Sequence, residues 1–523
     1  MPPRKKPAAP STDAAAAFSL AQTELIAPLP SFPTTLRTTA ALLLAVTICG
    51  CATFRNYNAE LSQTISMAAS GNLDGAIKGL ERANKHHKKK DLLYYFELGE
   101  LERLRNRYDE SRKAWMEADT QVQVWESTAA INPEKLMSNV ASVLINDKSR
   151  PYEGHDFEKV MLSTRLALDH LARGDFDGAR VDIKRTHERE VLVASLREKE
   201  LRKTEEEARK RGVQSSFKEL NGYPVQSIDN PEVNTLRNSY QSAFSHYLAG
   251  YVYEALGEPS LAAAGYRQAI ELRPDQPLLE HALAELDSRI TARDNDDTDV
   301  LFVVESGTAP ARKSQQFSLP FFQANRMLVV PVSFPVIVPA QPAYLPAQLQ
   351  IEGENPIDVV AITSIDLMAR KALQEEMPGI VLRGIIRSTA KAVAQNQASM
   401  HDDSGLAALA ITIGSIITES ADERGWRSLP AQIAIGRARI PSGAHTITLQ
   451  TPEGVRSVQL NLAGRYTVVG LRLLGSQLFV QAPEGVTAGA GRQSTDARAT
   501  QAPSTGGRPE TLEPQPPAME TSK

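Results

Sequence analysis

Cysteine is almost absent from this chain of 523 residues, which contains two, Cys49 and Cys51. Both lie near the N-terminus, so no pair of cysteines is left to cross-link the rest of the chain. The same scarcity excludes a cysteine-ligated zinc site and a thiol nucleophile beyond residue 51. A chain without free thiols beyond its N-terminal segment is suited to an oxidising compartment.

The common signatures of enzyme active sites are missing as well. The sequence has no GxxxxGK[ST] phosphate loop, no GxGxxG after a strand, no GxSxG turn and no HExxH motif. The nine histidines are scattered apart from His86 and His87, and three lysines that follow this pair would repel a metal ion. We therefore expect no catalytic residue, no bound metal and no cofactor.

Neither sign of charge is in excess. The chain has 58 basic and 62 acidic residues, which gives a net charge of −4. That balance predicts no general attraction to nucleic acid or to acidic membranes.

A short apolar run precedes Cys51. Residues 40–48 form this run, which is within the range of a signal-peptide core and well short of the about 20 residues that a transmembrane helix needs. Arg37 lies before the run, and the small residue Gly50 directly precedes Cys51. The alternative interpretation is a buried helix or a single membrane anchor that ends in cysteine.

The passage 40–51, AALLLAVTICGC, resembles the lipobox of bacterial lipoproteins. The resemblance implies that residues 1–50 are a leader and signal peptide and that Cys51 becomes the acylated N-terminal residue. A lipid anchor of this kind holds a protein firmly to a membrane. Ala52, in place of Asp, follows the cysteine, which by resemblance to lipoprotein sorting favours the outer membrane over the inner one. The leader 1–36 is longer than such signals usually are.

Four segments between residues 57 and 274 share one pattern of apolar and turn residues at helical spacing. Each has a turn with Gly or Asn between two helices, and these turns are at 71–76, 106–111, 174–179 and 257–262. Gly99 and Gly250 are small residues that would let a first helix meet a second helix closely, and Trp115 and Tyr266 are expected to fill the space between repeats. The pattern resembles tetratricopeptide repeats, which stack helix pairs into a superhelix with a concave groove. An irregular helical bundle is the alternative.

From about residue 298 short runs rich in β-branched residues predict strands. The expected strands are 300–305, 327–338, 347–352, 432–440, 444–449, 455–462 and 477–482. Helical patterns lie between them near 357–376, 379–398 and 405–420. The residues 484–523 are rich in Gly, Pro, Thr, Ser and Gln, and we expect them to be disordered.

A basic stripe lies on the expected helix 379–395. Arg383, Arg387 and Lys391 are spaced four residues apart, so they share one helix face beside an apolar one. Such a stripe could bind lipid head groups, an anionic wall polymer or the carboxylates of a partner. The alternative is a helix packed on a sheet, with its cations in water or paired to acids.

Two further passages, 303–310 with VVESGTAP and 421–430 with ADERGWRSLP, complete a second resemblance. With the lipobox, the fourth repeat and the basic helix, they resemble an uncharacterised family of bacterial envelope lipoproteins that combine tetratricopeptide repeats with a β-containing C-terminal domain. Related proteins tend to be encoded near lipoproteins that activate penicillin-binding proteins, which implies a connection with wall assembly. Within 421–430, Trp426 is expected in the core rather than on the surface.

The sequence therefore predicts an α+β protein with four parts. These are a leader and signal peptide at 1–50, an all-α repeat domain at 51–295, a mixed, β-rich domain at 296–483 and a disordered tail at 484–523. We expect a lipid-anchored envelope scaffold that binds a protein partner through its repeats and has no enzymatic activity. The alternatives are an envelope enzyme acting on wall polymer and a subunit of a secretion or polymer-export complex.

Overall fold

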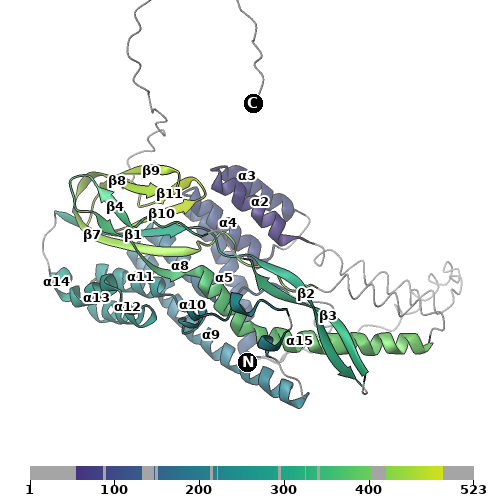
Figure 1. The fold of residues 1–523 in the computed structure, drawn as a ribbon. Helices are drawn as coiled ribbons and strands as arrows, with labels where there is room; N and C mark the ends of the chain where they lie inside the picture. The colour runs from purple at the N-terminus through teal and green to yellow at the C-terminus, as the bar shows by residue number, and fades with distance from the viewer. Residues whose placement is uncertain are drawn as a thin grey trace, which may run out of the picture.

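The computed structural model describes residues 55–85, 90–131, 147, 151–211, 216–220, 222–291, 296–323, 326–338, 342–401 and 420–486. The lipobox with Cys51, the His86–His87 pair, nearly all of the helix expected at 405–420 and residues 487–523 lie outside this set. A helical part precedes a β-rich part, as the sequence predicts (Figure 1). None of the described helices is long and apolar enough to cross a membrane.

Four helix pairs make up most of the helical part, and they coincide with the four predicted repeats. The pairs are α2 (Tyr57–Ala69) and α3 (Leu73–Ala83), α4 (Leu92–Leu104) and α5 (Tyr108–Ile131), α8 (Asp156–Leu171) and α9 (Phe176–Lys210), and α11 (Ala243–Ala255) and α12 (Pro259–Leu272). Shorter elements are η2 (Phe217–Glu219), η3 (Val225–Ser227), α10 (Pro231–Asn234), α13 (Pro277–Ala284) and α14 (Leu286–Thr291).

The turns within the pairs have the conformation that their sequences predict. The left-handed residues are Gly71 (φ 85°), Asn106 (φ 58°), Gly174 (φ 74°) and Gly257 (φ 72°), one in each pair. Asn72 and Asp175 then begin the second helices, because their side chains accept hydrogen bonds from the backbone N–H of Gly75 (2.9 Å) and Gly178 (2.8 Å). The repeated GN/GD turn motif is therefore a left-handed helix end followed by a helix cap.

The two glycines predicted to let helices approach closely do so. A Cβ atom at Gly99 would lie 2.2 Å from Nε1 of Trp115, and one at Gly250 would lie 2.6 Å from the Tyr266 ring. Both aromatic side chains are fully buried. The packing of α4 on α5 and of α11 on α12 thus requires glycine at these positions.

In the β-rich part, the described residues form two sheets, a hairpin and one long helix. The five-stranded sheet has the order β11 (Gln477–Gln481), β10 (Tyr466–Leu474), β1 (Asp297–Ser306), β7 (Gln432–Pro441) and β6 (Val360–Ser364), in which β1 and β10 are parallel. The four-stranded sheet has the order β5 (Ile357–Asp358), β4 (Gln348–Ile351), β8 (Gly443–Thr451) and β9 (Gly454–Leu462). β2 (Arg312–Gln323) and β3 (Arg326–Ile337) form the hairpin, and α15 (Ile365–His401) is the helix.

All seven predicted strands are present, but two predictions in this part are wrong. The expected helix at 357–376 begins instead as strands β5 and β6, because Val360–Ser364 pairs with β7. The helices expected on either side of Pro378 are one helix, α15. It continues through the proline because Met377 and Ile380 are buried with residues of β2 and β3. β2 and β10 were not predicted.

The helical and β-rich parts share one hydrophobic core. Its main cluster combines helical residues such as Phe96 and Leu166 with Leu301 and Val303 of β1 and with Trp426. The five-stranded sheet lies on α8 and α11 (Figure 1). The predicted boundary near residue 295 matches the change from helix to strand, but packing is continuous across it.

This arrangement fills the inner surface of the repeats. All 16 residues of α8 are buried, and Tyr251 of α11 donates a hydrogen bond to the backbone oxygen of Asp299 in β1 (2.6 Å). The expectation of an open concave groove is therefore wrong for the part of the chain that the structure describes. The surface that would bind a peptide in a repeat protein here holds the chain's own sheet.

Candidate functional site

A polar cavity lies where the start of α8, the side of α9, the base of the β2–β3 hairpin and α15 meet. Its volume is about 160 Å³, and its lining includes His155, Asp156, Arg197, Arg312 and Glu376. These residues come from four separate regions of the chain. The cavity is charged rather than apolar, unlike most pockets for drug-sized ligands.

His155, Glu376 and Arg312 form the centre of this cavity. His155 Nδ1 lies 2.9 Å from one oxygen of Glu376, and Arg312 donates to the other at 2.6 Å. His155 Nε2 lies 3.1 Å from the backbone oxygen of Arg424, so both ring nitrogens face acceptors. Burial and Arg312 oppose protonation, yet the carboxylates of Glu376 and Glu158 raise the pKa of His155. Burial would raise the pKa of Glu376, but Arg312 and His155 hold it well below its usual range.

A second charged group also lines the cavity. Asp156 accepts a hydrogen bond from Nε of Arg197 (2.9 Å) and lies 3.3 Å from Nζ of Lys159. Although Asp156 is buried, these two cations lower its pKa. The ammonium of Lys159 also lies 3.5 Å from the centre of the Trp125 ring. Asp156, Arg197 and Lys159 are therefore paired with groups of the protein itself.

The hydrogen-bonding capacity that remains in the cavity is donor capacity. Nη2 of Arg312 is buried and has no hydrogen-bond partner among the described residues. An acceptor group such as a carboxylate matches this atom chemically. Within the described ranges no group of His, Cys, Asp or Glu is arranged to hold a metal ion.

The predicted basic stripe reaches this cavity from one side. Arg383 lines it and lies 3.5 Å from Asp147, and Arg387 lies 3.3 Å from the same carboxylate. Arg387 is 1% exposed. Lys391 is on the same helix, but its side chain lies outside the described set. This pairing with Asp147 agrees with the alternative interpretation of the stripe, in which the helix is packed in the protein and its cations are paired to acids.

The segment 421–430 is buried against the helices, as expected for Trp426. Its ring is 1% exposed, stacks on Phe96 (4.4 Å between ring centres) and meets Trp115 edge-on (5.9 Å). The backbone N–H of Trp426 donates to Glu158 (2.6 Å), and that of Arg427 donates to Glu97 (2.6 Å). Buried carboxylates on α4 and α8 thus hold a strand-connecting segment in place.

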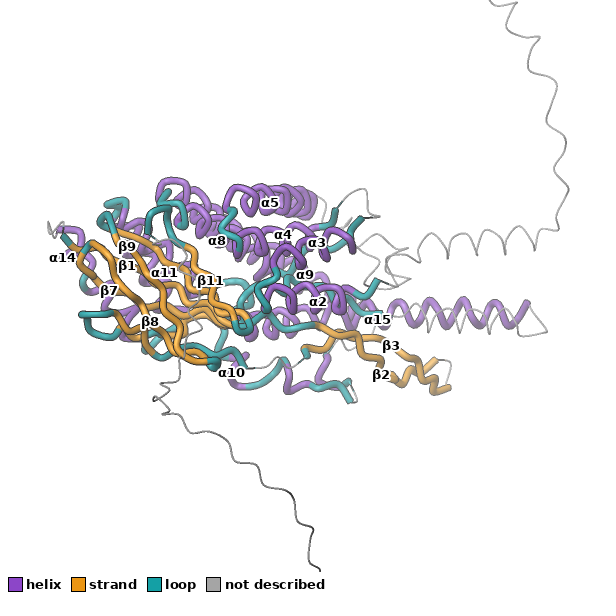
Figure 2. Tube along the Cα trace, turned by 90° about the horizontal axis from the view of Figure 1, so that it is seen from above, coloured by secondary structure: helices purple, strands orange, loops and turns teal. Residues whose placement is uncertain are grey.

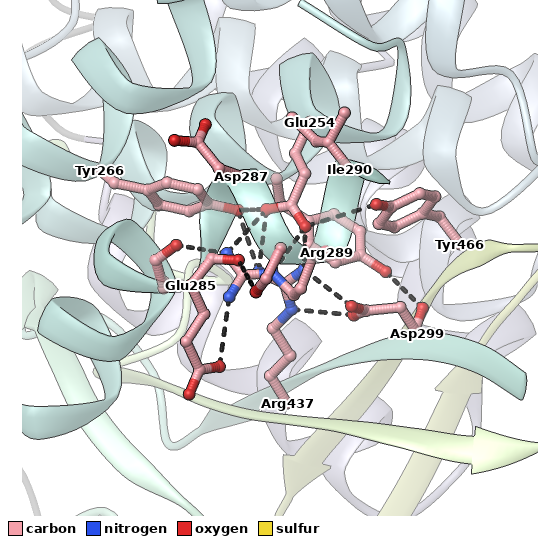
Figure 3. A network of polar contacts seen from close by, with 12 residues as sticks. Glu254, Tyr266, Glu285, Asp287, Arg289, Ile290, Asp299, Arg437 and Tyr466 are labelled. Carbon is pink, nitrogen blue, oxygen red and sulfur yellow. Dashed lines mark hydrogen bonds and ion pairs between the residues drawn. The ribbon is translucent and has the colours of Figure 1, made fainter. Parts of the chain in front are cut away.

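A network around Arg437 joins the fourth repeat to the sheet (Figure 3). Arg437 of β7 donates to both oxygens of Asp299 on β1 (2.8 Å each) and to Glu254 of α11 (2.6 Å). Glu254 also accepts from Arg289 (2.8 Å) and from the hydroxyl of Tyr266 (2.6 Å). Burial would raise the pKa of Glu254, but the two arginines and Tyr266 lower it.

A third charged cluster lies inside the core between α4, α8 and the sheet. Arg165 donates a hydrogen bond to Glu305 of β1, while Arg103 lies 3.7 Å from Glu305 and 3.3 Å from Asp169. Burial raises the pKa of Asp169 to about 7 despite Arg103. Burial lowers the pKa of the neighbouring Arg472 to about 10. These groups orient the sheet on the helices and are closed to ligands.

Sequence reasoning did not find the centre of the cavity. His155 and Glu376 are 221 residues apart, and no local pattern connects them. The stripe on α15 was the one signal near this place, since Arg383 and Glu376 occupy the same helix.

Comparison with known proteins adds little. No family model matches the chain, and no curated protein matches it. A crystal structure of a tetratricopeptide repeat protein from Parabacteroides merdae is similar at 10% identity and a TM-score of 0.13, over 44% of this chain and 98% of that one. A likeness at that TM-score supports no functional conclusion, so the helix pairs themselves define the repeat architecture. The resemblance to envelope lipoproteins stays a prediction.

Proposed function

We propose that this protein is a bacterial envelope scaffold, anchored by lipid on Cys51 and facing the periplasm, that binds a protein partner through the outer surface of its helix pairs. The lipobox-like passage supports the anchor and, with Ala52, the outer membrane. The described fold begins at Arg55, four residues after Cys51, so an acylated N-terminus would hold the body close to the membrane.

One observation supports the choice of this surface as the binding site. Six of the eight exposed large hydrophobic residues among the described residues lie on second helices of the pairs: Met116, Val124, Val181, Val191, Leu201 and Leu261. The first helices α4, α8 and α11 are largely buried. We take these residues as the contact surface, because contiguous exposed apolar patches are typical of interaction sites. A partner would therefore bind the outer side of α5, α9 and α12.

The cavity gives little support to the alternative of an enzyme acting on wall polymer. Glycoside hydrolysis needs one carboxylic acid with a raised pKa and a second carboxylate. Burial would raise the pKa of Asp156, Glu376 and Asp422, which line the cavity, but their arginine, histidine or lysine partners lower it. His155 is bonded at both nitrogens and is not available as a base. These features favour a binding protein.

Site-specific photo-crosslinking in cells tests the surface. A photoreactive residue replaces Val191 on α9, which is 72% exposed, or Val455 on β9, which is 56% exposed and serves as the matched control. We expect a defined adduct from Val191 that is absent from Val455 and is lost when Val124→Glu is added. Equal adducts from both positions, or none from Val191, would contradict the proposed surface.

Mass spectrometry of the purified protein tests the anchor separately. The N-terminal peptide should begin CATFR and carry the mass of the acyl groups. A chain that retains residues 38–50 would exclude the anchor.

A further inference from the structure

The polar cavity around His155 has room for more than the side chains that line it. It lies at the start of α8, between the side of α9, the base of the β2–β3 hairpin and α15. α9 and α15 are neighbours, and the hairpin extends alongside α15 (Figures 1 and 2). The volume of about 160 Å³ is enough for several water molecules or for one small ligand. The cavity reaches the surface beside Glu200, whose side chain is 48% exposed.

The unsatisfied hydrogen-bonding groups of this cavity are donors. Nη2 of Arg312 has no hydrogen-bond partner among the described residues, and the same is true of Nε1 of Trp125, which α5 contributes to the lining. Arg312 is 5% exposed. The buried carboxylate oxygens of the described lining all have partners. Since a buried donor without an acceptor costs free energy, Arg312 and Trp125 favour an acceptor group in the cavity.

The cations around the cavity favour an acceptor that carries negative charge. His155 and Arg312 share a single carboxylate, that of Glu376. The second ring nitrogen of His155 faces the backbone oxygen of Arg424, and only a protonated imidazole donates to both acceptors. Two more carboxylates of the lining are each shared by two cations; they are Asp156, with Arg197 and Lys159, and Asp147, with Arg383 and Arg387.

The remaining acids of the lining limit the ligand to one negative charge. Glu153, Glu200 and Asp422 also line the cavity. Asp422 is paired with Arg424 (2.7 Å), but a second charge on the ligand would still lie among several carboxylates and be repelled. A dianion such as phosphate is therefore disfavoured. A carboxylate carries one charge on two oxygens and is the anion whose shape matches a guanidinium group.

We propose that this cavity binds a small carboxylate ligand, with Arg312 as the charged donor and the indole N–H of Trp125 as a second donor. The ligand is either a free small acid or the carboxylate at the end of a peptide chain, because both present the same group to Arg312. The site is separate from the outer helix surface proposed for a protein partner. It is also independent of acylation at Cys51.

Fluorine NMR of protein labelled with fluorotryptophan reads the cavity through Trp125. The chain has three tryptophans, and Trp115 and Trp426 are buried in the core, where they serve as internal references. We expect the Trp125 resonance, assigned with Trp125→Phe, to shift saturably at roughly millimolar acetate, the range that so small a ligand allows. The other two resonances should stay in place. Sodium chloride at the same ionic strength and acetamide, the neutral analogue of acetate, should not shift Trp125.

A blocked dipeptide distinguishes the two sources of the carboxylate. N-acetyl-alanyl-alanine has a free C-terminal carboxylate, and its C-terminal amide is the matched control. Tighter binding of the dipeptide acid than of acetate supports a chain end, and binding of acetate alone supports a free small acid.

Three outcomes of the NMR experiment overturn the proposal. The first is that neither acetate nor the dipeptide acid shifts the Trp125 resonance, which would mean that water or the protein's own groups satisfy the donors. The second is an equal shift with chloride, which would indicate a site for any anion. The third is an equal shift with acetamide or with the dipeptide amide, which would indicate that charge has no part in binding.

Calorimetry with the carboxylate that shifts Trp125 tests the role of Arg312. Arg312→Gln should weaken binding at least about tenfold, because a hydrogen bond to a charged group is lost. The control is Arg370→Gln, which breaks a similar pair on α15, with Asp366 (2.7 Å), outside the cavity and should bind like the parent. Where circular dichroism shows that Arg312→Gln does not fold, Arg312→Lys decides, since it keeps a cation beside Glu376 and removes the guanidinium fork. Parent-like affinity in a folded Arg312 variant overturns the proposal.

Discussion

Arg437 is a position where a single substitution should weaken the contact between the fourth repeat and the sheet. Its guanidinium donates to both oxygens of Asp299 at 2.8 Å and to the two oxygens of Glu254 at 2.6 and 3.2 Å. Methionine at this position keeps much of the side-chain length and removes the charge. Asp299 then loses both of these bonds, whereas Glu254 keeps Arg289 and Tyr266.

The expected effect of Arg437→Met is large. Removal of one partner from a buried ion pair typically costs about 3–5 kcal/mol, because the remaining charge stays buried without compensation. We expect the free energy of unfolding at pH 7 to fall by that amount. Arg439→Met is the matched control on the same strand, since Arg439 is 39% exposed and lies 3.8 Å from Asp297. The control should change the free energy of unfolding by less than about 1 kcal/mol.

Denaturant unfolding, followed by both circular dichroism and tryptophan fluorescence, measures these effects. Both signals should move together in Arg437→Met, because Trp115 and Trp426 lie in the core that helices and sheet share. The pKa of Glu254 is lowered in the folded state, so its contribution is present above its ordinary value of 4.5 and is lost as the pH falls through the folded value. The difference between parent and variant should shrink accordingly in acid. A loss below about 1 kcal/mol at pH 7 would refute the assignment of this network as a buried ionic contact.

Two further predictions concern single buried positions. Gly99→Ala should destabilise the protein, because the new Cβ would lie 2.2 Å from Trp115. Its control is Gly79→Ala on α3, which meets no atom within 4 Å and should be neutral or stabilising by up to about 1 kcal/mol. Thermal unfolding measures both variants, and equal melting temperatures would contradict the prediction. Burial raises the pKa of Glu97 to about 7, so its neutral form is favoured in the folded state and stability is lost as the pH rises from 4.5 through 7. We expect the free energy of unfolding of the parent protein to fall by about 3 kcal/mol between pH 5 and pH 8 through this group, and Glu97→Gln should abolish that fall. Denaturant unfolding measures it, and an unchanged pH dependence in the variant would exclude Glu97 as the source.

The local sequence was sufficient to predict the repeats. Each turn requires a left-handed residue, and glycine or asparagine at Gly71, Asn106, Gly174 and Gly257 supplies it. Most strands were likewise predictable, because their β-branched runs end at turn residues such as Gly443 and Gly454. These features depend on neighbours within a few residues.

Features that depend on distant partners could not be predicted in this way. Val360–Ser364 has a sequence compatible with a helix and becomes a strand because it pairs with β7. Arg387 has the spacing of an exposed stripe and is buried because Asp147, 240 residues away, accepts its charge. The cavity centre could not be predicted for the same reason, because the fold brings His155 and Glu376 together from distant parts of the chain. Spacing along one element identifies a shared face but not what will cover it.

The parallel pairing of β1 with β10 has a consequence for biosynthesis. Val300 is hydrogen-bonded into the same ladder as Thr467, so the central sheet is incomplete until residues of β10 have left the ribosome. All of α8 is buried in the finished protein, and one of the two carboxylates that its Arg165 contacts, Glu305, lies on β1. The helices are therefore synthesised long before the surface that covers them. A chain arrested after the fourth repeat would expose apolar and charged groups together, and chaperones would have to hold it until the last strands arrive.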